Sequence, residues 1–207
     1  FVSCKMDVVA LVFTGTETLA ELISDFDFIQ VRPTQLSNFR QGMLVERGFY
    51  RIYLSVQSAI QEVLAELIGR RTQFVVTGHS LGGALATLGS FDLTAYCPFV
   101  YTFASPRVGN PIFAQGYNHL LHPVWRVDNS SDIVPDVPLP AFLVLIYEHV
   151  GNPVVFTLNL GTILNNHIEA YRRVIIEQQP PDNPNGVCPL RFDCSSKKCP
   201  HAECSKK

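Results

Sequence analysis

One short segment of the chain restricts its possible folds more than any other. Residues 74–86, Phe-Val-Val-Thr-Gly-His-Ser-Leu-Gly-Gly-Ala-Leu-Ala, read as a strand, a sharp turn around Ser80 and a helix of small residues. Gly78 and Gly82 flank the serine in the spacing G-x-S-x-G of a nucleophile elbow, which exposes a serine hydroxyl above a sheet. The helix that follows would direct its positive N-terminus toward that hydroxyl. The segment therefore predicts a nucleophilic serine, and an ordinary strand-to-helix turn is the alternative.

The hydrophobic pattern of the rest of the chain predicts strands that alternate with helices. Apolar runs indicate strands over residues 8–13, 73–77, 99–103, 124–127 and 154–158. Helical spacing indicates helices over residues 19–23, 50–68, 81–94 and 167–177. Because such alternation is typical of parallel sheets, we expect an α/β fold with a mostly parallel central sheet and helices on both faces.

Length and composition favour a single folded domain with a tail. The 207 residues, 47% of them hydrophobic, suffice for a sizeable core. We expect the domain to span residues 1–179, and residues 180–207 to form a Pro/Asn/Gly linker and a cysteine-rich tail. The net charge of −2 and the lack of a basic cluster argue against nucleic acid as a partner. The first residues do not resemble a signal peptide and look like the start of a mature or trimmed chain.

The cysteines indicate an oxidising environment. The chain has six of them, four in its last twenty residues: Cys4, Cys97, Cys188, Cys194, Cys199 and Cys204. An even number of clustered cysteines favours disulfide bonds in a secreted or lumenal protein. A small metal site built from Cys194, Cys199, His201 and Cys204 is the alternative. The spacing of these residues fits zinc patterns poorly, so we expect no metal.

A serine hydroxyl needs a base that removes its proton, usually a histidine held by a carboxylate. In sheets of this type the partners follow in the order Ser, Asp or Glu, His, which leaves His149, His167 and His201. His167 is favoured because it lies at a loop-to-helix boundary, where a side chain can project into a site. His149 suits a packing role and His201 lies in the tail. His79 precedes Ser80 directly, and we expect its side chain to point away.

Asp132 is the favoured carboxylate. It lies in the loop that leaves the strand expected over residues 124–127, and sites of parallel sheets assemble at such strand ends. Asp128 and Asp136 look like turn or surface acids. Asp92 lies on the helix after the elbow and is expected to face its own surroundings.

Acyl transfer also needs two donors for the negative charge on the substrate oxygen. The backbone N–H of Leu81 is one candidate. The other is Thr16, in the Thr14-Gly15-Thr16 loop after the first expected strand. An ordinary turn is the alternative for that loop.

With these residues in place, the chain resembles the class 3 (fungal-type) triacylglycerol lipase family of α/β-hydrolases over about residues 8–175. The matching segments lie in the family's order: residues 11–16, 48–50, 78–86, 101–110, 132–135, 149–151, and His167 with Tyr171. The most specific is Ser-Pro-Arg-Val-Gly-Asn at residues 105–110. The resemblance implies an α/β-hydrolase fold, a catalytic triad of Ser80, Asp132 and His167, and an oxyanion hole formed by Thr16 and Leu81.

The resemblance reaches further residues. It implies that Asp25 steadies the oxyanion-hole residue, and a helix-end acid is the alternative. An aspartate often precedes the catalytic histidine in the family, and here that residue is Asn166. Residues 19–31 would form a short lid or an acyl-pocket wall, with ordinary core packing as the alternative.

We therefore expect a serine hydrolase that cleaves carboxylic esters, above all those of acylglycerol lipids, through an acyl-enzyme on Ser80. It would need neither metal nor cofactor. The expected partners are a lipid or other ester substrate and, transiently, a lipid surface; we expect a secreted or lumenal monomer. The alternative is a catalytically silent lipase-like module that uses its pocket for lipid binding or another interaction.

Overall fold

The computed structural model describes residues 2–5, 8–15, 28–69, 72–120, 123–142 and 145–177. The helix expected over residues 19–23, most of the expected lid segment, and the tail from residue 180 lie outside these residues. So do Thr16 and Asp25. The proposed domain boundary at residue 179 stays a prediction.

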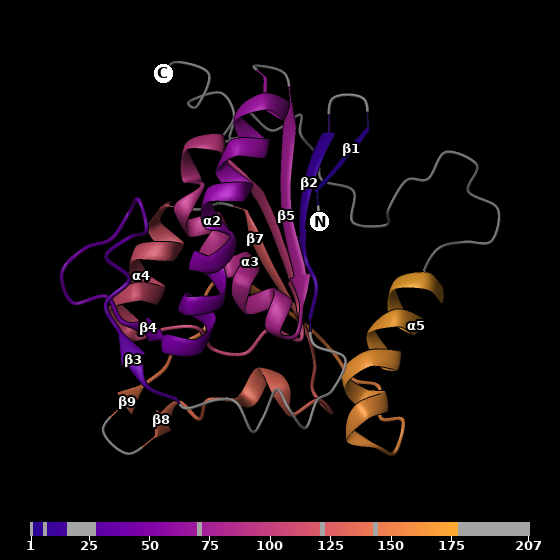
Figure 1. The fold of residues 1–207 in the computed structure, drawn as a ribbon. Helices are drawn as coiled ribbons and strands as arrows, with labels where there is room; N and C mark the ends of the chain where they lie inside the picture. The colour runs from indigo at the N-terminus through magenta and orange to yellow at the C-terminus, as the bar shows by residue number, and fades with distance from the viewer. Residues whose placement is uncertain are drawn as a thin grey trace.

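The described chain is built around a six-stranded sheet with the order β1-β2-β5-β6-β7-β10 (Figure 1). Its strands are β1 (Val2–Lys5), β2 (Val8–Phe13), β5 (Gln73–His79), β6 (Phe99–Phe103), β7 (Val124–Asn129) and β10 (Asn152–Phe156). All neighbouring pairs from β2 to β10 are parallel, and β1 runs antiparallel to β2 at one edge. The expected mostly parallel sheet is therefore confirmed.

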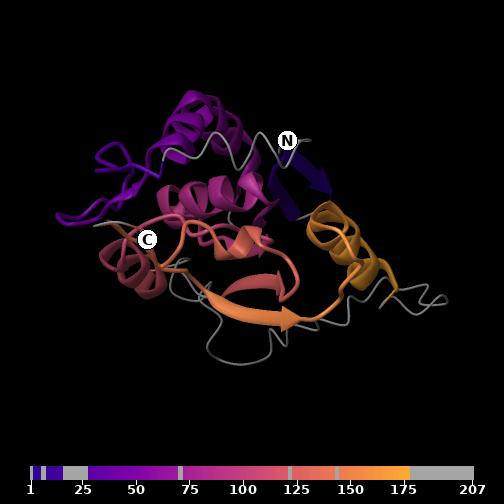
Figure 2. The same cartoon turned by 90° about the horizontal axis from the view of Figure 1, so that it is seen from below.

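Helices cover both faces of this sheet. They are α2 (Arg47–Leu67), α3 (Leu81–Asp92), α4 (Pro111–Leu120) and α5 (Ala170–Glu177), with 3₁₀ turns η1 (Thr94–Tyr96) and η2 (Val134–Asp136). A π-helical turn, η3 (Asn165–Glu169), leads directly into α5. Figures 1 and 2 show α2, α3 and α4 on one side of the sheet and α5 on the other.

The sequence explains the helices next to the sheet. The Glu46 side chain caps α2 by accepting a 2.7 Å hydrogen bond from the N–H of Phe49. The inward face of α2 then buries Phe49, Tyr53 and Leu64, each at most 1% exposed. Every residue of α3 from Gly82 to Asp92 is buried. Its small side chains let α3 lie between α2 and the sheet and hold the turn before it firmly in place.

Several elements differ from the sequence-based expectations. Short strand pairs join β3 (Gln30–Val31) to β4 (Val45–Glu46), and β8 (Ala141–Phe142) to β9 (Leu145–Ile146). Strands of two residues are too short for a hydrophobic period to reveal. The strand expected over residues 154–158 is β10, two residues earlier, because its pairing with β7 and not its apolar pattern fixes its limits. The helix expected from residue 167 starts two residues earlier, as the turn η3.

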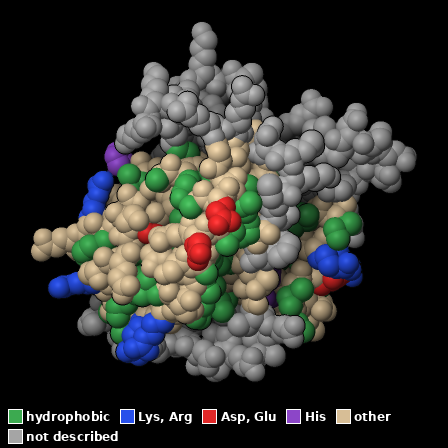
Figure 3. Space-filling model, turned by 45° about the horizontal axis from the view of Figure 1, so that its top comes forward, with side chains coloured by type: hydrophobic (Ala, Val, Ile, Leu, Met, Phe, Trp, Pro, Cys, Tyr) green, Lys and Arg blue, Asp and Glu red, His purple; other side chains and the backbone are tan. Residues whose placement is uncertain are grey.

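The surface carries charges of both signs. In the view of Figure 3, the described Lys and Arg side chains are scattered near the edge, acidic side chains lie closer to the centre, and hydrophobic side chains lie between them.

Among the described residues, no helix combines the length and apolar character needed to cross a membrane. The same residues hold no cluster of three His, Cys, Asp or Glu side chains suited to a metal ion. Cys97 is disulfide-bonded.

Candidate active site

Ser80 occupies a strained turn between β5 and α3. Its φ of 60° and ψ of −127° lie in a backbone region that residues other than glycine rarely adopt. A Cβ atom on Gly78 would lie 2.1 Å from the carbonyl oxygen of Gly82, and one on Gly82 would lie 2.1 Å from that of Phe13. Both positions therefore exclude any side chain. The turn has the geometry of a nucleophile elbow, with the serine held at the carboxyl end of β5.

Two backbone segments approach this serine. Leu81 is the first residue of α3, so its N–H has no partner within the helix. The loop after β2 crosses the turn at Gly15, where a Cβ atom would lie 2.9 Å from the carbonyl oxygen of His79 and 3.5 Å from the Cβ of Ser80. The loop named as a source of an oxyanion donor is therefore next to the serine.

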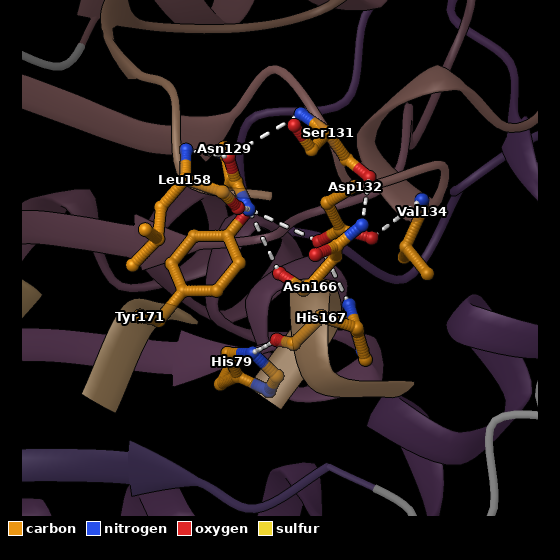
Figure 4. A network of polar contacts seen from close by, with 9 residues as sticks. All are labelled: His79, Asn129, Ser131, Asp132, Val134, Leu158, Asn166, His167 and Tyr171. Atoms are coloured by element: carbon orange, nitrogen blue, oxygen red, sulfur yellow. Dashed lines mark hydrogen bonds and ion pairs between the residues drawn. The ribbon is translucent and has the colours of Figure 1, made fainter. Parts of the chain in front are cut away.

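Asp132 and His167 meet in a buried hydrogen bond. Asp132 follows β7, and His167 lies in the turn η3; each is 3% exposed. The Nδ1–H of His167 donates to Oδ2 of Asp132 over 2.8 Å (Figure 4). Because an ionised carboxylate can only accept, the imidazole proton resides on Nδ1 and leaves Nε2 free to accept another proton.

Two further donors fix the carboxylate of Asp132. The hydroxyl of Tyr171 donates to the same Oδ2 over 3.0 Å, and the N–H of Val134 donates to Oδ1 over 3.0 Å. The Tyr171 hydroxyl also accepts from the N–H of Asn129 over 2.8 Å. Burial and the nearby Asp132 raise the pKa of Tyr171, so its hydroxyl keeps the proton that it donates.

The expectation that His79 points away from the site is wrong. Its Nε2–H donates to the carbonyl oxygen of His167 over 2.7 Å, and the centroids of the two rings are 4.6 Å apart. The positive φ of Ser80 ends the regular strand alternation on which that expectation relied. Burial, followed by the influence of His167, lowers the pKa of His79 to about 4. His79 is therefore a neutral donor at ordinary pH.

The other histidine candidate has a different partner. His149 Nε2 donates to the carbonyl oxygen of Pro135 over 2.7 Å. Burial and the charges of Arg126 and Arg107 lower the pKa of His149 to about 3. These contacts agree with the packing role considered for it.

The remaining carboxylates lie in different environments. Asp136 is exposed and lies 3.7 Å from a guanidinium nitrogen of Arg107, as expected for a surface acid. Asp128 was expected at a turn or on the surface, which is wrong: it is 6% exposed and forms an ion pair with Arg126. It lies within β7, whose last three residues are all buried.

Asp92 ends α3 in a pocket of neutral donors, in agreement with its expected separate surroundings. The Tyr53 hydroxyl donates to it over 2.8 Å, and the N–H and the hydroxyl of Ser37 donate over 2.7 and 2.9 Å. Asp92 therefore links the end of α3 to α2, through Tyr53, and to the loop between β3 and β4, through Ser37.

Two asparagines join the loops of the site; the sequence analysis did not name Asn129, and it named Asn166 only as a departure from the family pattern. Asn129 ends β7 and Asn166 precedes His167, and both are buried. Figure 4 shows Asn166 next to Asp132 and His167, and Asn129 near Leu158 and Tyr171. The apolar residues around them indicated a strand and a helix. Asparagine is common in turns, so its type alone does not indicate a buried contact between two loops.

Comparison with known proteins identifies close similarities. Residues 10–142 match the family model described as Lipase (class 3). The lipase of Rhizopus niveus is 34% identical over 151 residues, which cover 68% of this chain and 37% of that protein. The secreted mono- and diacylglycerol lipase A of Penicillium cyclopium is 34% identical over 153 residues, which cover 69% of this chain and 46% of that protein.

Solved structures agree. The triacylglyceride lipase of Rhizomucor miehei superposes with a TM-score of 0.61 at 30% sequence identity, over 72% of this chain and 57% of that one. The chain spans less than half the length of the two curated relatives above.

Proposed function

The chain belongs to the class 3 lipase family, and on that premise we propose that it is a serine hydrolase that cleaves carboxylic esters of acylglycerols through an acyl-enzyme on Ser80. One observation carries the proposal: the buried 2.8 Å hydrogen bond between His167 and Asp132, in a turn whose backbone is contacted by His79, the residue before Ser80. Asp, His and Ser in this relation are the components of nucleophilic acyl transfer.

In the proposed first step, Nε2 of His167 takes the proton of the Ser80 hydroxyl while the oxygen attacks the ester carbonyl carbon. The imidazolium that forms is stabilised by Asp132, which accepts from Nδ1. The tetrahedral intermediate collapses, the bond to the alcohol oxygen breaks, and His167 gives its proton to the leaving alcohol. The acyl group remains on Ser80.

In the second step, His167 takes a proton from water, and the hydroxide attacks the acyl-enzyme. The carboxylic acid leaves, and the proton returns to Ser80. The N–H of Leu81 supplies one proposed donor to the oxyanion of both tetrahedral intermediates, and Thr16 is the proposed second donor. Removal of one such donor typically raises the barrier by about 2.7–4 kcal/mol.

The side chains next to the site support a lipid ester as substrate. Ile133 follows Asp132, Ile168 follows His167, and Leu164 directly precedes the turn η3 that carries His167. These three residues are 41–50% exposed. Exposed aliphatic side chains beside a polar site suit an acyl chain better than a hydrophilic ester, and they suit transient contact with a lipid surface. The names of the similar proteins, which include a mono- and diacylglycerol lipase, point to the same class.

We further propose a secreted or lumenal monomer. The disulfide at Cys97 suits an oxidising compartment, and the Penicillium relative is described as secreted.

The proposal is tested with p-nitrophenyl esters of short and long acyl chains, followed by diacylglycerol and triacylglycerol emulsions. Wild-type protein is expected to hydrolyse them, and the Ser80→Ala variant should lose about 10⁴-fold or more in kcat. Ser130→Ala, which changes an exposed serine after β7, is the control and should keep the wild-type rate.

A fluorophosphonate probe gives an independent readout, because it reacts only with an activated serine. We expect labelling of wild type and of Ser130→Ala, and none of Ser80→Ala. Absence of both turnover and labelling in folded wild-type protein would favour the silent binding module instead.

A further inference from the structure

Two buried asparagine side chains join the loop of Asp132 to the turn of His167. Asn129 is 1% exposed and Asn166 is 8% exposed. Asn129 is close in sequence to Asp132, and Asn166 directly precedes His167. Neither side chain hydrogen-bonds the side chains of Ser80 or His167. Buried amides of this kind need a full set of partners, since an unpaired one is costly.

Asn129 holds three segments together. Its Nδ2–H₂ donates to the carbonyl oxygens of Leu158 and Asn166, over 2.9 and 3.0 Å. Its Oδ1 accepts from the N–H of Leu158 over 3.0 Å and from that of Ser131 over 3.3 Å. The amide at the end of β7 therefore reaches the residue that precedes His167.

Asn166 makes the reciprocal connection. Its Nδ2–H₂ donates to the carbonyl oxygen of Ser131, the residue before Asp132, over 3.0 Å, and to Oδ1 of Asn159 over 3.4 Å. Its Oδ1 accepts from the N–H of Leu160 over 2.6 Å. The contacts therefore run in both directions between the two loops (Figure 4).

This arrangement requires amides. A carboxamide is the side-chain group that offers two N–H donors and an acceptor oxygen together. An ionised carboxylate would face carbonyl oxygens without a proton to share, and an aliphatic side chain would leave buried backbone groups unpaired. The π-helical turn at residues 165–169 adds a reason for such bracing, because π turns are irregular and frequent at functional sites.

We propose that Asn129 and Asn166 are positioning residues that hold the carboxylate of Asp132 and the imidazole of His167 in reacting geometry. The inference rests on the proposed serine hydrolase function and deepens it. Asn129 fixes the backbone beside His167, and Asn166 fixes the backbone beside Asp132. With either amide removed, the two loops can shift relative to each other, and the 2.8 Å contact between His167 and Asp132 lengthens.

The test compares Asn129→Ala and Asn166→Ala with Asn165→Ala, which removes the same side chain from an exposed neighbouring position. We expect kcat for a short p-nitrophenyl ester to fall about 10- to 100-fold in the first two variants, since a misplacement of about 1 Å has effects of this size. KM should stay within about 3-fold, because the amides contact no substrate. Asn165→Ala should match wild type.

Two readouts separate positioning from mere structural support. The rate of fluorophosphonate labelling at Ser80 should fall in parallel with kcat. The acid limb of the profile of kcat/KM against pH should move to lower pH, because a weaker contact with Asp132 stabilises the imidazolium less. Reduced thermal stability with unchanged kcat, labelling and pH profile would overturn the inference.

If Asn166→Ala does not fold, Asn166→Asp replaces it at nearly constant volume. Burial and the facing oxygens of Ser131 and Asn159 raise the pKa of the introduced carboxyl. Its protonated form keeps a donor to Ser131 and its ionised form does not, so the loss of kcat relative to wild type should be greater at pH 9 than at pH 6. A ratio to wild type that is near one and constant with pH would contradict the inference. Inactive wild-type protein would instead refute the proposed function itself.

Discussion

The Nε2 atom of His79 lies 2.7 Å from the carbonyl oxygen of His167, so the residue before Ser80 hydrogen-bonds the backbone of the proposed base. The ring of His79 also lies edge-on to that of Tyr171, with centroids 5.4 Å apart. The strand that carries the proposed nucleophile is thereby attached to the turn that carries its base. The hydrogen bonds of Asn129 and Asn166 attach that same turn to the loop of Asp132.

This attachment predicts a ranking of substitutions at residue 79. His79→Phe keeps an aromatic ring but removes the donor to the carbonyl oxygen of His167, and loss of one such hydrogen bond costs about 0.5–1.5 kcal/mol. We expect kcat to fall about 10-fold, because the turn that carries His167 is then held less firmly relative to Ser80. His79→Gln keeps an N–H donor and should retain more activity than His79→Phe. Ester hydrolysis by the two variants, compared at equal folded fraction, checks the ranking, and the reverse order would contradict it.

The two buried neutral histidines predict a loss of stability in acid. The pKa of His79 is lowered to about 4 and that of His149 to about 3, whereas both imidazoles have a pKa near 6.5 in the unfolded chain. Below about pH 6.5 the unfolded state therefore binds more protons than the native state. The free energy of unfolding should fall as the pH drops from about 6.5 toward 4, by up to about 1.4 kcal/mol per pH unit for each imidazole.

Urea unfolding at intervals between pH 7 and pH 4 measures this effect. His149→Gln keeps a donor for Pro135 without a titrating ring, so its stability should depend less steeply on pH than that of wild type. His119→Gln changes an exposed histidine at the end of α4 and is the control, with the wild-type slope. Equal slopes for all three proteins would refute the prediction.

The Tyr171 hydroxyl predicts a combined defect in stability and activity. Tyr171→Phe removes the donor to Asp132 and leaves the buried N–H of Asn129 without its acceptor. The free energy of unfolding should fall by about 1–3 kcal/mol. A less firmly held Asp132 should also lower kcat several-fold. Chemical denaturation and ester hydrolysis give the two quantities, and Tyr96→Phe, at a half-buried tyrosine next to Phe74, is the matched control.

The features that could be predicted from the sequence are those set by residues that lie near one another in it. The Ser80 turn was evident because contacts within a few residues require its glycines, such as the close approach of Gly78 to Gly82. Hydrophobic period indicated the parallel strands of the sheet and the helices α2, α3 and α5, but neither α4 nor the edge strand β1. The favoured carboxylate and base came from loop position, chain order and family resemblance, and the structure joins Asp132 to His167.

Other features depend on partners that are distant in sequence. Asn166 contacts residues 131, 159 and 160, and nothing in its neighbouring residues indicates these partners. Asp128 is buried because β7 continues to Asn129 and pairs there with β10, which follows much later in the sequence. His79 was misassigned because strand alternation does not extend through a turn with positive φ. Long-range polar contacts therefore account for most of what the sequence did not predict.

The last prediction concerns the loop over Ser80. In Gly15→Ala, the new methyl group would lie 2.9 Å from the carbonyl oxygen of His79, so the loop must move by a few tenths of an ångström. Because the proposed oxyanion donor Thr16 follows directly, hydrolysis should suffer more than folding. We expect kcat to fall about 10-fold or more, against the 10²–10³-fold of a lost oxyanion donor, with little change in thermal stability. Gly69→Ala, where the nearest atom is 3.8 Å away, is the control and should keep full activity. Unchanged kcat in folded Gly15→Ala would show that the loop after β2 does not position an oxyanion donor.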